Sequence, residues 1–147
     1  VMWLDGDSRL DNGYYFEPTV IGDCTATMAV VREEVFGPVV VVLPFDDEEE
    51  AISLANDSRF GLAAAIWTSS VSRAHRVAEE LDVGIIWIND HHRNDPSSPW
   101  GGTKDSGLGR ENGKDALREY TQSKSVVVNC SDAPFDWFSD KEHVRYS

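Results

Sequence analysis

Three apolar runs lie in the first two thirds of the chain, and each has the length of a β-strand. They span Val39–Leu43, Leu62–Thr68 and Ile85–Ile88. An unbroken apolar run of this length is typical of a strand that is buried on both faces, as in a parallel sheet. Val39–Leu43 is the clearest example, and Pro44 closes it. The pattern therefore predicts three buried strands.

Polar stretches with helical features separate these runs. The acids of Asp46–Glu50 would supply an N-cap and an acidic first turn for a helix that reaches about Ala55. Ser70 would cap a second helix with its apolar positions on one face. These positions are Ala74, Val77, Ala78 and Leu81. Because strands and helices alternate with short connections, the predicted fold class is α/β, with a mostly parallel βαβαβ sheet.

The segments on either side of this pattern are less regular. Ahead of it, Tyr14–Phe16 is predicted to be a strand and Glu17–Ile21 a further extended piece. Behind it comes a long loop rich in Asn, Asp, Pro, Ser and Gly, a kind of loop that usually has a function. The last elements are this loop over residues 89–112, a helix over 113–120 and a strand over 123–129.

Composition and charge narrow the class of protein. The chain has 147 residues, of which 41% are hydrophobic, enough for one domain with its own core. The net charge of −13 argues against a nucleic-acid surface and against anionic membranes. No apolar run approaches the roughly 20 residues of a membrane span. Cys24 and Cys130 lie far apart and outside any metal-binding spacing, so the sequence favours a reducing, cytoplasmic environment.

Two candidate sites fail on their spacing. Gly107, Gly109 and Gly113 match neither the P-loop nor the dinucleotide-binding pattern. They are interpreted as tight-turn residues, with a close approach to a ligand as the alternative. His91 and His92 lack a third ligand at a diagnostic spacing, so no metal site is predicted. A serine or cysteine nucleophile with a local signature is also absent from the sequence.

Several segments match one enzyme family in order along the chain. They are GYYFEPTVIGD, REEVFGPVV, AND-x-x-FGLAAAIWT, GIIWIND, PWGGTKDSGLGRENG and REYTQSKSV. Over about residues 12–128 the chain resembles the C-terminal third of the NAD(P)-dependent aldehyde dehydrogenases. The EEVFGP and PWGG-x-K-x-SG-x-GRE motifs are the most specific. The resemblance implies three parts: part of the catalytic domain over 1–122, an oligomerisation strand over 123–130, and an irregular tail over 131–147.

The family resemblance also implies roles for single residues. Glu34 would hydrogen-bond the hydroxyls of the nicotinamide ribose, and Phe36 would pack beside the nicotinamide of NAD or NADP. Elementary chemistry agrees, because a carboxylate accepts two hydrogen bonds from a vicinal diol and an apolar ring suits a flat heterocycle. Trp100 would form part of the wall of the aldehyde tunnel, and Asn89 would lie near its entrance. The strand over 125–130 would pair with a partner subunit and form a homo-oligomer.

The same resemblance implies which parts lie elsewhere. The family's nucleophile is a cysteine in a Gly-Gln-x-Cys context, which neither Cys24 nor Cys130 has. The general-base Glu, the oxyanion Asn and the cofactor domain also fall outside the matched segments. The chain is therefore expected to be a fragment of an enzyme that oxidises an aldehyde to a carboxylic acid with NAD(P)+, and to be inactive alone. The alternative is a non-catalytic binding or assembly module derived from the same fold.

The class of aldehyde depends on Trp100 and its surroundings. Related enzymes often carry Phe at this position, and a Trp there resembles the betaine-aldehyde branch. A tryptophan face attracts a quaternary ammonium group, and it also stacks on an aryl or indolyl aldehyde. Because Arg93 would repel a cation if it faced the tunnel, the sequence favours an aromatic or other uncharged aldehyde.

Overall fold

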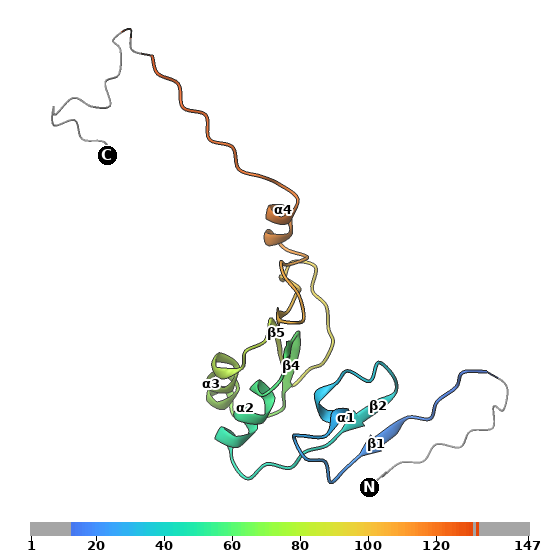
Figure 1. Cartoon of the computed structure of the whole chain (residues 1–147). Helices are drawn as coiled ribbons and strands as arrows, with labels where there is room; N and C mark the ends of the chain where they lie inside the picture. The colour runs from blue at the N-terminus through green and yellow to red at the C-terminus, as the bar shows by residue number, and fades with distance from the viewer. Residues whose placement is uncertain (1–12, 131, 133–147) are drawn as a thin grey trace.

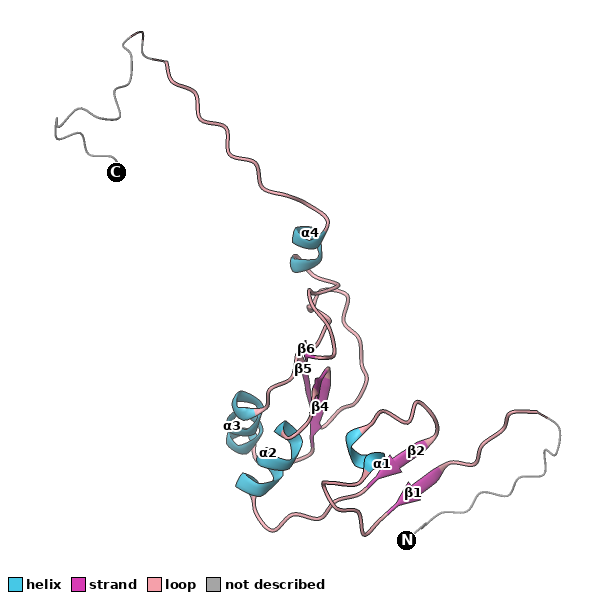
Figure 2. Ribbon diagram, in the orientation of Figure 1, coloured by secondary structure: helices cyan, strands magenta, loops and turns pink. Residues whose placement is uncertain are grey.

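The computed structural model describes residues 13–130 and residue 132, and Figures 1 and 2 show its elements. The helices are α1 (Ala29–Arg32), α2 (Glu48–Asn56), α3 (Val71–Glu80) and α4 (Asp115–Glu119). The strands are β1 (Thr19–Ile21), β2 (Val39–Val41), β3 (Phe60–Gly61), β4 (Ala63–Ile66), β5 (Ile85–Ile88) and β6 (Thr103–Lys104). In this part of the chain, no helix is long and apolar enough to cross a membrane.

Parallel pairing predominates among the strands, as the alternating pattern predicts. β4 and β5 pair in parallel from Ala63↔Ile85 to Ile66↔Ile88, and α3 is the crossover between them. β1 and β2 form a second parallel pair, and α1 lies between them in the sequence. β3 and β6 form a short antiparallel pair. The α/β class with parallel strands is therefore confirmed.

Among the described residues, the strands of the predicted βαβαβ pattern are divided between separate sheets. β2 pairs with β1 and not with β4, so the described strands form three separate two-stranded sheets. The apolar run that begins at Val39 is a strand only as far as Val41, and Val40 and Val42 are 55% and 51% exposed. A strand is buried on both faces only where other elements cover both faces. The exposure of these valines shows that the described helices do not provide such cover.

Local capping starts the two longer helices where the sequence predicts. The Asp47 side chain accepts a hydrogen bond from the Glu50 N–H at 2.9 Å, and Glu50 Oε2 accepts one from the Asp46 N–H at 2.7 Å. Ser70 Oγ accepts from the Arg73 N–H at 3.3 Å. These bonds satisfy backbone donors that have no partner inside the first helical turn. Both predicted helix starts are confirmed.

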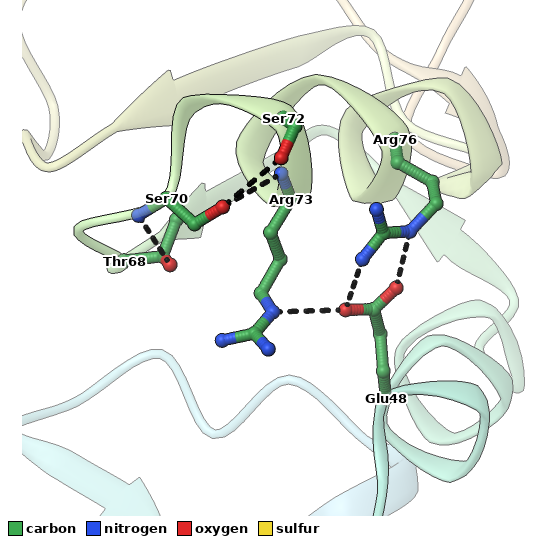
Figure 3. Close-up of polar contacts among 6 residues, drawn as sticks. All are labelled: Glu48, Thr68, Ser70, Ser72, Arg73 and Arg76. Carbon is green, nitrogen blue, oxygen red and sulfur yellow. Dashed lines mark hydrogen bonds and ion pairs between the residues drawn. The ribbon is translucent and has the colours of Figure 1, made fainter.

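Glu48 joins α2 to α3 through a single carboxylate (Figure 3). Its oxygens accept hydrogen bonds from Arg76 Nε at 2.7 Å, from Arg76 Nη2 at 2.9 Å and from Arg73 Nε at 3.1 Å. The hydrogen bond from Arg76 is the largest cause that lowers the pKa of Glu48, and the charges of both guanidinium groups lower it further. The first-turn acid that the sequence assigned to helix capping therefore also links two helices.

This contact makes the packing of α2 on α3 sensitive to acid. Because the pKa is lowered in the folded state, Glu48 stabilises the fold above its ordinary value of 4.5, and this stability is lost as the pH falls through the lowered value. Glu48→Gln should make the free energy of unfolding fall less steeply on acidification. Denaturant titrations at neutral and acidic pH measure this slope. Glu49→Gln is the matched control, and equal slopes in wild type and Glu48→Gln would contradict the role of Glu48.

Two regions that flank the central pattern differ from their predictions. Tyr14–Phe16 forms no strand, and its three aromatic side chains are exposed. The long loop contains regular structure, because it carries β6 and a β-bridge between Trp100 and Glu111. Pairings of this kind join residues far apart in the sequence, so local composition did not reveal them. The fourth helix is present but shorter than predicted, at Asp115–Glu119.

Residues 121–130 extend away from α4 and from the other described elements (Figure 1). They form no strand, and Val126, Val127 and Val128 are 75%, 90% and 72% exposed. A strand forms only with a hydrogen-bonding partner. No described strand pairs with this segment. The oligomerisation strand therefore stays a prediction, and the predicted tail lies, apart from residue 132, outside the described residues.

The described part of the chain buries little apolar surface. Cys24 and Ala74, at 8% and 2% exposure, are its buried hydrophobic residues. Large apolar side chains such as Trp67, at 70%, and Phe45, at 59%, stay exposed. The expectation of a core within this single chain is therefore wrong for the described residues. The physical reason is that two-stranded sheets with few helices leave most of their faces uncovered.

Candidate functional site

The loop after α1 presents the two residues that the family resemblance assigns to the cofactor. Glu34 is exposed, and its carboxylate makes no hydrogen bond or ion pair with another described residue. Phe36 is 91% exposed, and its backbone has a left-handed φ of 55°. A bulky residue rarely adopts this conformation. The loop thus carries a carboxylate that has no partner among the described residues. Two residues further along, it carries an aromatic ring with an open face.

Arg32, the last residue of α1, connects this loop to the end of α2. Its Nε donates to Ala26 O at 2.6 Å, its Nη1 to Asp57 O at 2.9 Å, and its Nη2 to Asp57 Oδ2 at 2.7 Å. The hydrogen bond from Arg32 is the largest cause that lowers the pKa of Asp57. Three contacts from one planar guanidinium group define its orientation better than a single contact would. The start of the loop is therefore tied to a helix end.

Trp100 belongs to an aromatic cluster formed with Trp87, His91 and His92. Its ring centroid lies 5.9 Å from that of Trp87 and 6.0 Å from that of His92. His91 lies 5.6 Å from Trp87 and 5.8 Å from His92. Trp87 Nε1 donates to Arg93 O at 2.9 Å, which holds the indole in place. No local signal in the sequence points to Trp87, because the cluster depends on how the loop folds back over β5.

Trp100 also lines a hollow beside the glycine-rich loop. Its N–H donates to Glu111 O and its carbonyl accepts from the Glu111 N–H, each at 2.7 Å, which folds the loop back on itself. The hollow has a volume of about 360 Å³, and its walls include Leu62, Leu108 and Tyr120. A hollow of this size with mixed polar and apolar walls suits a small organic molecule. Trp100 therefore lies beside a space that a substrate could occupy.

Asn89 and Arg93 have partners that bear on their predicted roles. Asn89 Oδ1 accepts from the Thr68 N–H and its Nδ2 donates to Thr68 O, each at 2.8 Å, so its side chain extends the pairing of β4 with β5. Arg93 is 82% exposed, and its Nη1 lies 3.7 Å from Asp90 Oδ2. Because Asp90 partly offsets the charge of Arg93, the argument that Arg93 would repel a cationic substrate is weakened.

The predicted site residues fall into two groups, in loops next to strands of different sheets. Glu34 and Phe36 precede β2, whereas Asn89 and Trp100 follow β5. Among the described residues, the structure records no hydrogen bond, ion pair or ring contact between the two groups. The cofactor and tunnel roles of all four residues therefore stay predictions.

Glycines shape the loop that carries Trp100. Gly107, Gly109 and Gly113 have φ values of 126°, 77° and 59°, which confirms their interpretation as tight-turn residues. Gly84, the residue before β5, has a different role. A Cβ atom at this position would overlap the carbonyl group of Gly101. The absence of a side chain at Gly84 thus lets the Trp100 loop pack directly against the strand.

Gly84→Ala should therefore destabilise the protein. The methyl group would push the Gly101 backbone away from β5, and overpacking of this kind costs typically about 1–3 kcal/mol. Chemical denaturation of wild type and variant measures the free energy of unfolding. Gly37→Ala is the matched control, because a Cβ there would meet only Val35 Cγ1, at 4.0 Å. If the two variants lose the same stability, the close approach at Gly84 is not the cause.

Comparison with known proteins identifies the family. The sequence model of the protein family described as "Aldehyde dehydrogenase family" matches residues 1–126 of the chain. The chain belongs to the aldehyde dehydrogenase family. A betaine aldehyde dehydrogenase of Bacillus subtilis is 48% identical over 133 residues, which cover 90% of this chain and 27% of that protein. One from Cereibacter sphaeroides is 49% identical over 132 residues, with 88% and 27% covered. The chain thus spans 27% of the length of these curated relatives.

Solved aldehyde dehydrogenase structures share the fold. The betaine aldehyde dehydrogenase of Staphylococcus aureus in complex with NAD+ is 51% identical, with a TM-score of 0.81, over 85% of this chain and 25% of that one. The NAD+ complex of an aldehyde dehydrogenase from Bacillus cereus is 49% identical, with a TM-score of 0.84, over 89% and 27%. The family resemblance found in the sequence motifs is therefore confirmed.

Proposed function

We propose that this chain is part of an NAD(P)-dependent aldehyde dehydrogenase that oxidises an aldehyde to a carboxylic acid. It contributes one wall of the nicotinamide site and part of the aldehyde pocket. The observation that carries the proposal is the EEVFGP loop, on which Glu34 has no partner among the described residues and Phe36 is 91% exposed. The NAD+ complexes of the similar S. aureus and B. cereus enzymes support it.

The residues of this loop fit a nicotinamide nucleotide. The Glu34 carboxylate is available to accept hydrogen bonds from both hydroxyls of a ribose. The open face of Phe36 suits a flat heterocycle, which would cover the exposed ring. When bound, NAD(P)+ supplies the acceptor for the hydride of the aldehyde. The part of Glu34 and Phe36 is to bind and orient the nucleotide and to keep water from one side of it.

The substrate class we propose is an aldehyde that carries a quaternary ammonium group. Trp87 and Trp100 have ring centroids 5.9 Å apart, and indole faces are the strongest aromatic binders of such a cation. The positive charge of Arg93 lies near Asp90. The similar curated proteins named above are betaine aldehyde dehydrogenases. The comparisons give no support to the aromatic aldehyde that the sequence favoured.

We further propose that the protein acts as a homo-oligomer in the cytoplasm. The extended segment with Val126–Val128 is mostly exposed, as described above, and an extended apolar segment can add to the edge of a sheet in another subunit. The cytoplasmic assignment rests on the two cysteines, which suit a reducing environment. A partner strand would also bury the three valines, which the described residues leave in solvent.

The proposal predicts that catalysis needs more protein than this chain. Cys24 is buried, and its Sγ donates a hydrogen bond to Ile21 O at 3.5 Å. Cys130 is exposed, and it lies outside the sequence context of the family's nucleophile. With betaine aldehyde and NAD+, the intact protein should form NADH, and the isolated chain should not. The increase in NADH absorbance, followed with each aldehyde of a panel, measures the turnover of both proteins.

Two results would count against the proposal. Turnover by the isolated chain that disappears in Cys24→Ala or Cys130→Ala would show that the chain carries its own nucleophile. An intact protein that binds NAD+ but oxidises no aldehyde would favour the alternative of a non-catalytic binding or assembly module. A general loss of folding is distinguished from both by the circular dichroism spectrum of each sample.

A further inference from the structure

We propose that the C-terminal turn of α2, residues Asn56 and Asp57, positions the cofactor loop and the Trp100 loop from one shared anchor. The proposal rests on the proposed function, because it assigns Glu34 to the cofactor and Trp100 to the aldehyde. The two loops make no recorded contact with each other within the described residues. Each loop, however, has one cationic side chain that hydrogen-bonds this helix end.

The first cation is Arg32, which lies just ahead of Glu34. Its guanidinium group donates to Asp57 O at 2.9 Å and to Asp57 Oδ2 at 2.7 Å. The same group holds Ala26 O at 2.6 Å, on the other side of α1. α1 is a helix of four residues, too short to be stable without tertiary contacts. The Arg32 contacts therefore decide where the Glu34 loop begins.

The second cation is Lys104, in β6, which follows Trp100 on the same loop. Its Nζ donates to Asn56 O at 3.0 Å and lies 3.3 Å from Asp82 Oδ2. The Lys104 side chain is only 22% exposed, so water competes weakly for the ammonium group. Lys104 has a left-handed φ of 53°, and the surrounding contacts must hold that backbone in place.

The turn itself is held firmly enough to serve as an anchor. Asn56 Nδ2 donates to Glu80 O at 2.7 Å, and Asn56 Oδ1 accepts from the Asp82 N–H at 2.8 Å, so its side chain connects α2 to the end of α3. The Asp57 N–H donates to Ser53 O at 2.9 Å. The neighbouring carbonyls of Asn56 and Asp57 lie at the negative end of the α2 dipole, where cations are favoured.

The anchor predicts separate effects on the two substrates. In the intact protein, Asp57→Ala should raise the Kd for NAD+ about threefold to fivefold, the size expected for an exposed ion pair. It should leave the KM for the aldehyde unchanged. Lys104→Met keeps the apolar stem but removes the ammonium, and should raise the KM for the aldehyde about tenfold, as for a charged hydrogen bond. It should leave the Kd for NAD+ unchanged.

Calorimetry measures the Kd for NAD+, and hydrogen exchange provides a readout that needs no activity. The N–H groups of residues 31–33 donate to Met28 O and Ala29 O, so these amides should exchange faster in Asp57→Ala, while those of β5 keep the wild-type rate. Asp57→Asn, which keeps an acceptor for Arg32, should restore most of the NAD+ affinity. Arg73→Ala is the control, because it removes a contact at the other end of α2.

Each alternative outcome is distinguishable. If Asp57→Ala and Arg73→Ala raise the Kd for NAD+ equally, the effect is a general loss of stability and the proposal is wrong. Unchanged exchange over residues 31–33 in Asp57→Ala would also overturn it. A wild-type protein that neither binds NAD+ nor oxidises an aldehyde would refute the proposed function. The exchange experiment would then still decide whether the turn anchors the loop.

Discussion

Glu34→Gln in the intact protein should slow hydride transfer about tenfold to a hundredfold, the equivalent of one charge-assisted hydrogen bond of about 1.5–3 kcal/mol. The variant keeps the size of the side chain and one acceptor oxygen, but it loses the charge that favours hydrogen bonds from the ribose. Placement of the nicotinamide should therefore suffer more than the later hydrolysis of the acyl-enzyme. Single-turnover measurement of NADH formation separates the two steps.

Glu33→Gln is a matched control for this experiment. Glu33 is the neighbouring exposed carboxylate, its backbone N–H donates to Ala29 O at 2.8 Å, and no cofactor role is implied for its side chain. Glu33→Gln removes one negative charge, as Glu34→Gln does. The assignment of Glu34 to the ribose would be refuted by equal rates of hydride transfer in wild type and Glu34→Gln, or by an equal loss in both variants.

Trp100→Leu should lower kcat/KM for betaine aldehyde about 30-fold, since a desolvated cation–π contact is worth about 2 kcal/mol. Leucine keeps apolar bulk beside Trp87 and His92 but removes the π face. Trp100→Phe retains a weaker π face, so it should retain more activity than the leucine variant. Steady-state kinetics with the purified intact protein measures both losses.

The neutral isostere of betaine aldehyde, with carbon in place of the quaternary nitrogen, isolates the charge. Its kcat/KM should change little in Trp100→Leu, because the shape and apolar area of the pocket are largely preserved. A similar loss for both aldehydes would mean that Trp100 acts through packing alone. If aryl aldehydes are the best substrates of the wild-type protein, the proposed substrate class is wrong and the preference drawn from the sequence is right.

Local signals in the sequence predicted where the two longer helices, α2 and α3, begin, but they did not predict α1. The acidic turn at Asp46–Glu50 and the hydroxyl of Ser70 each satisfy backbone donors within three or four residues, so the position at which each helix begins depends little on the rest of the protein. The parallel pairing of β4 with β5 was equally predictable, because a strand, a short helix and a second strand leave few other arrangements.

Predictions that depended on partners distant in the sequence were less successful. Whether Val39–Leu43 is buried depends on which elements cover it, and the structure pairs its first half with β1 only. The antiparallel pairing of β3 with β6 joins Phe60 to Lys104 across most of the central region. Neither pairing has a signal in local periodicity, because strand pairs form between whatever edges the fold brings together.

The candidate site divides in the same way. The motifs EEVFGP and PWGG resemble those of the family, and this resemblance made Glu34, Phe36 and Trp100 candidate residues. Each motif is a short contiguous segment, so it can be recognised without the fold. The aromatic neighbours of Trp100 could not be found in this way.

The sequence by itself determined the family, the α/β class and the helix caps, since each of these depends on residue type and short spacing. Only the tertiary structure decided that Arg32 and Lys104 meet one helix end at Asn56–Asp57. Charged hydrogen bonds form wherever folding brings a donor within about 3 Å of an acceptor. That distance depends on the path of the whole chain, and no single segment encodes it.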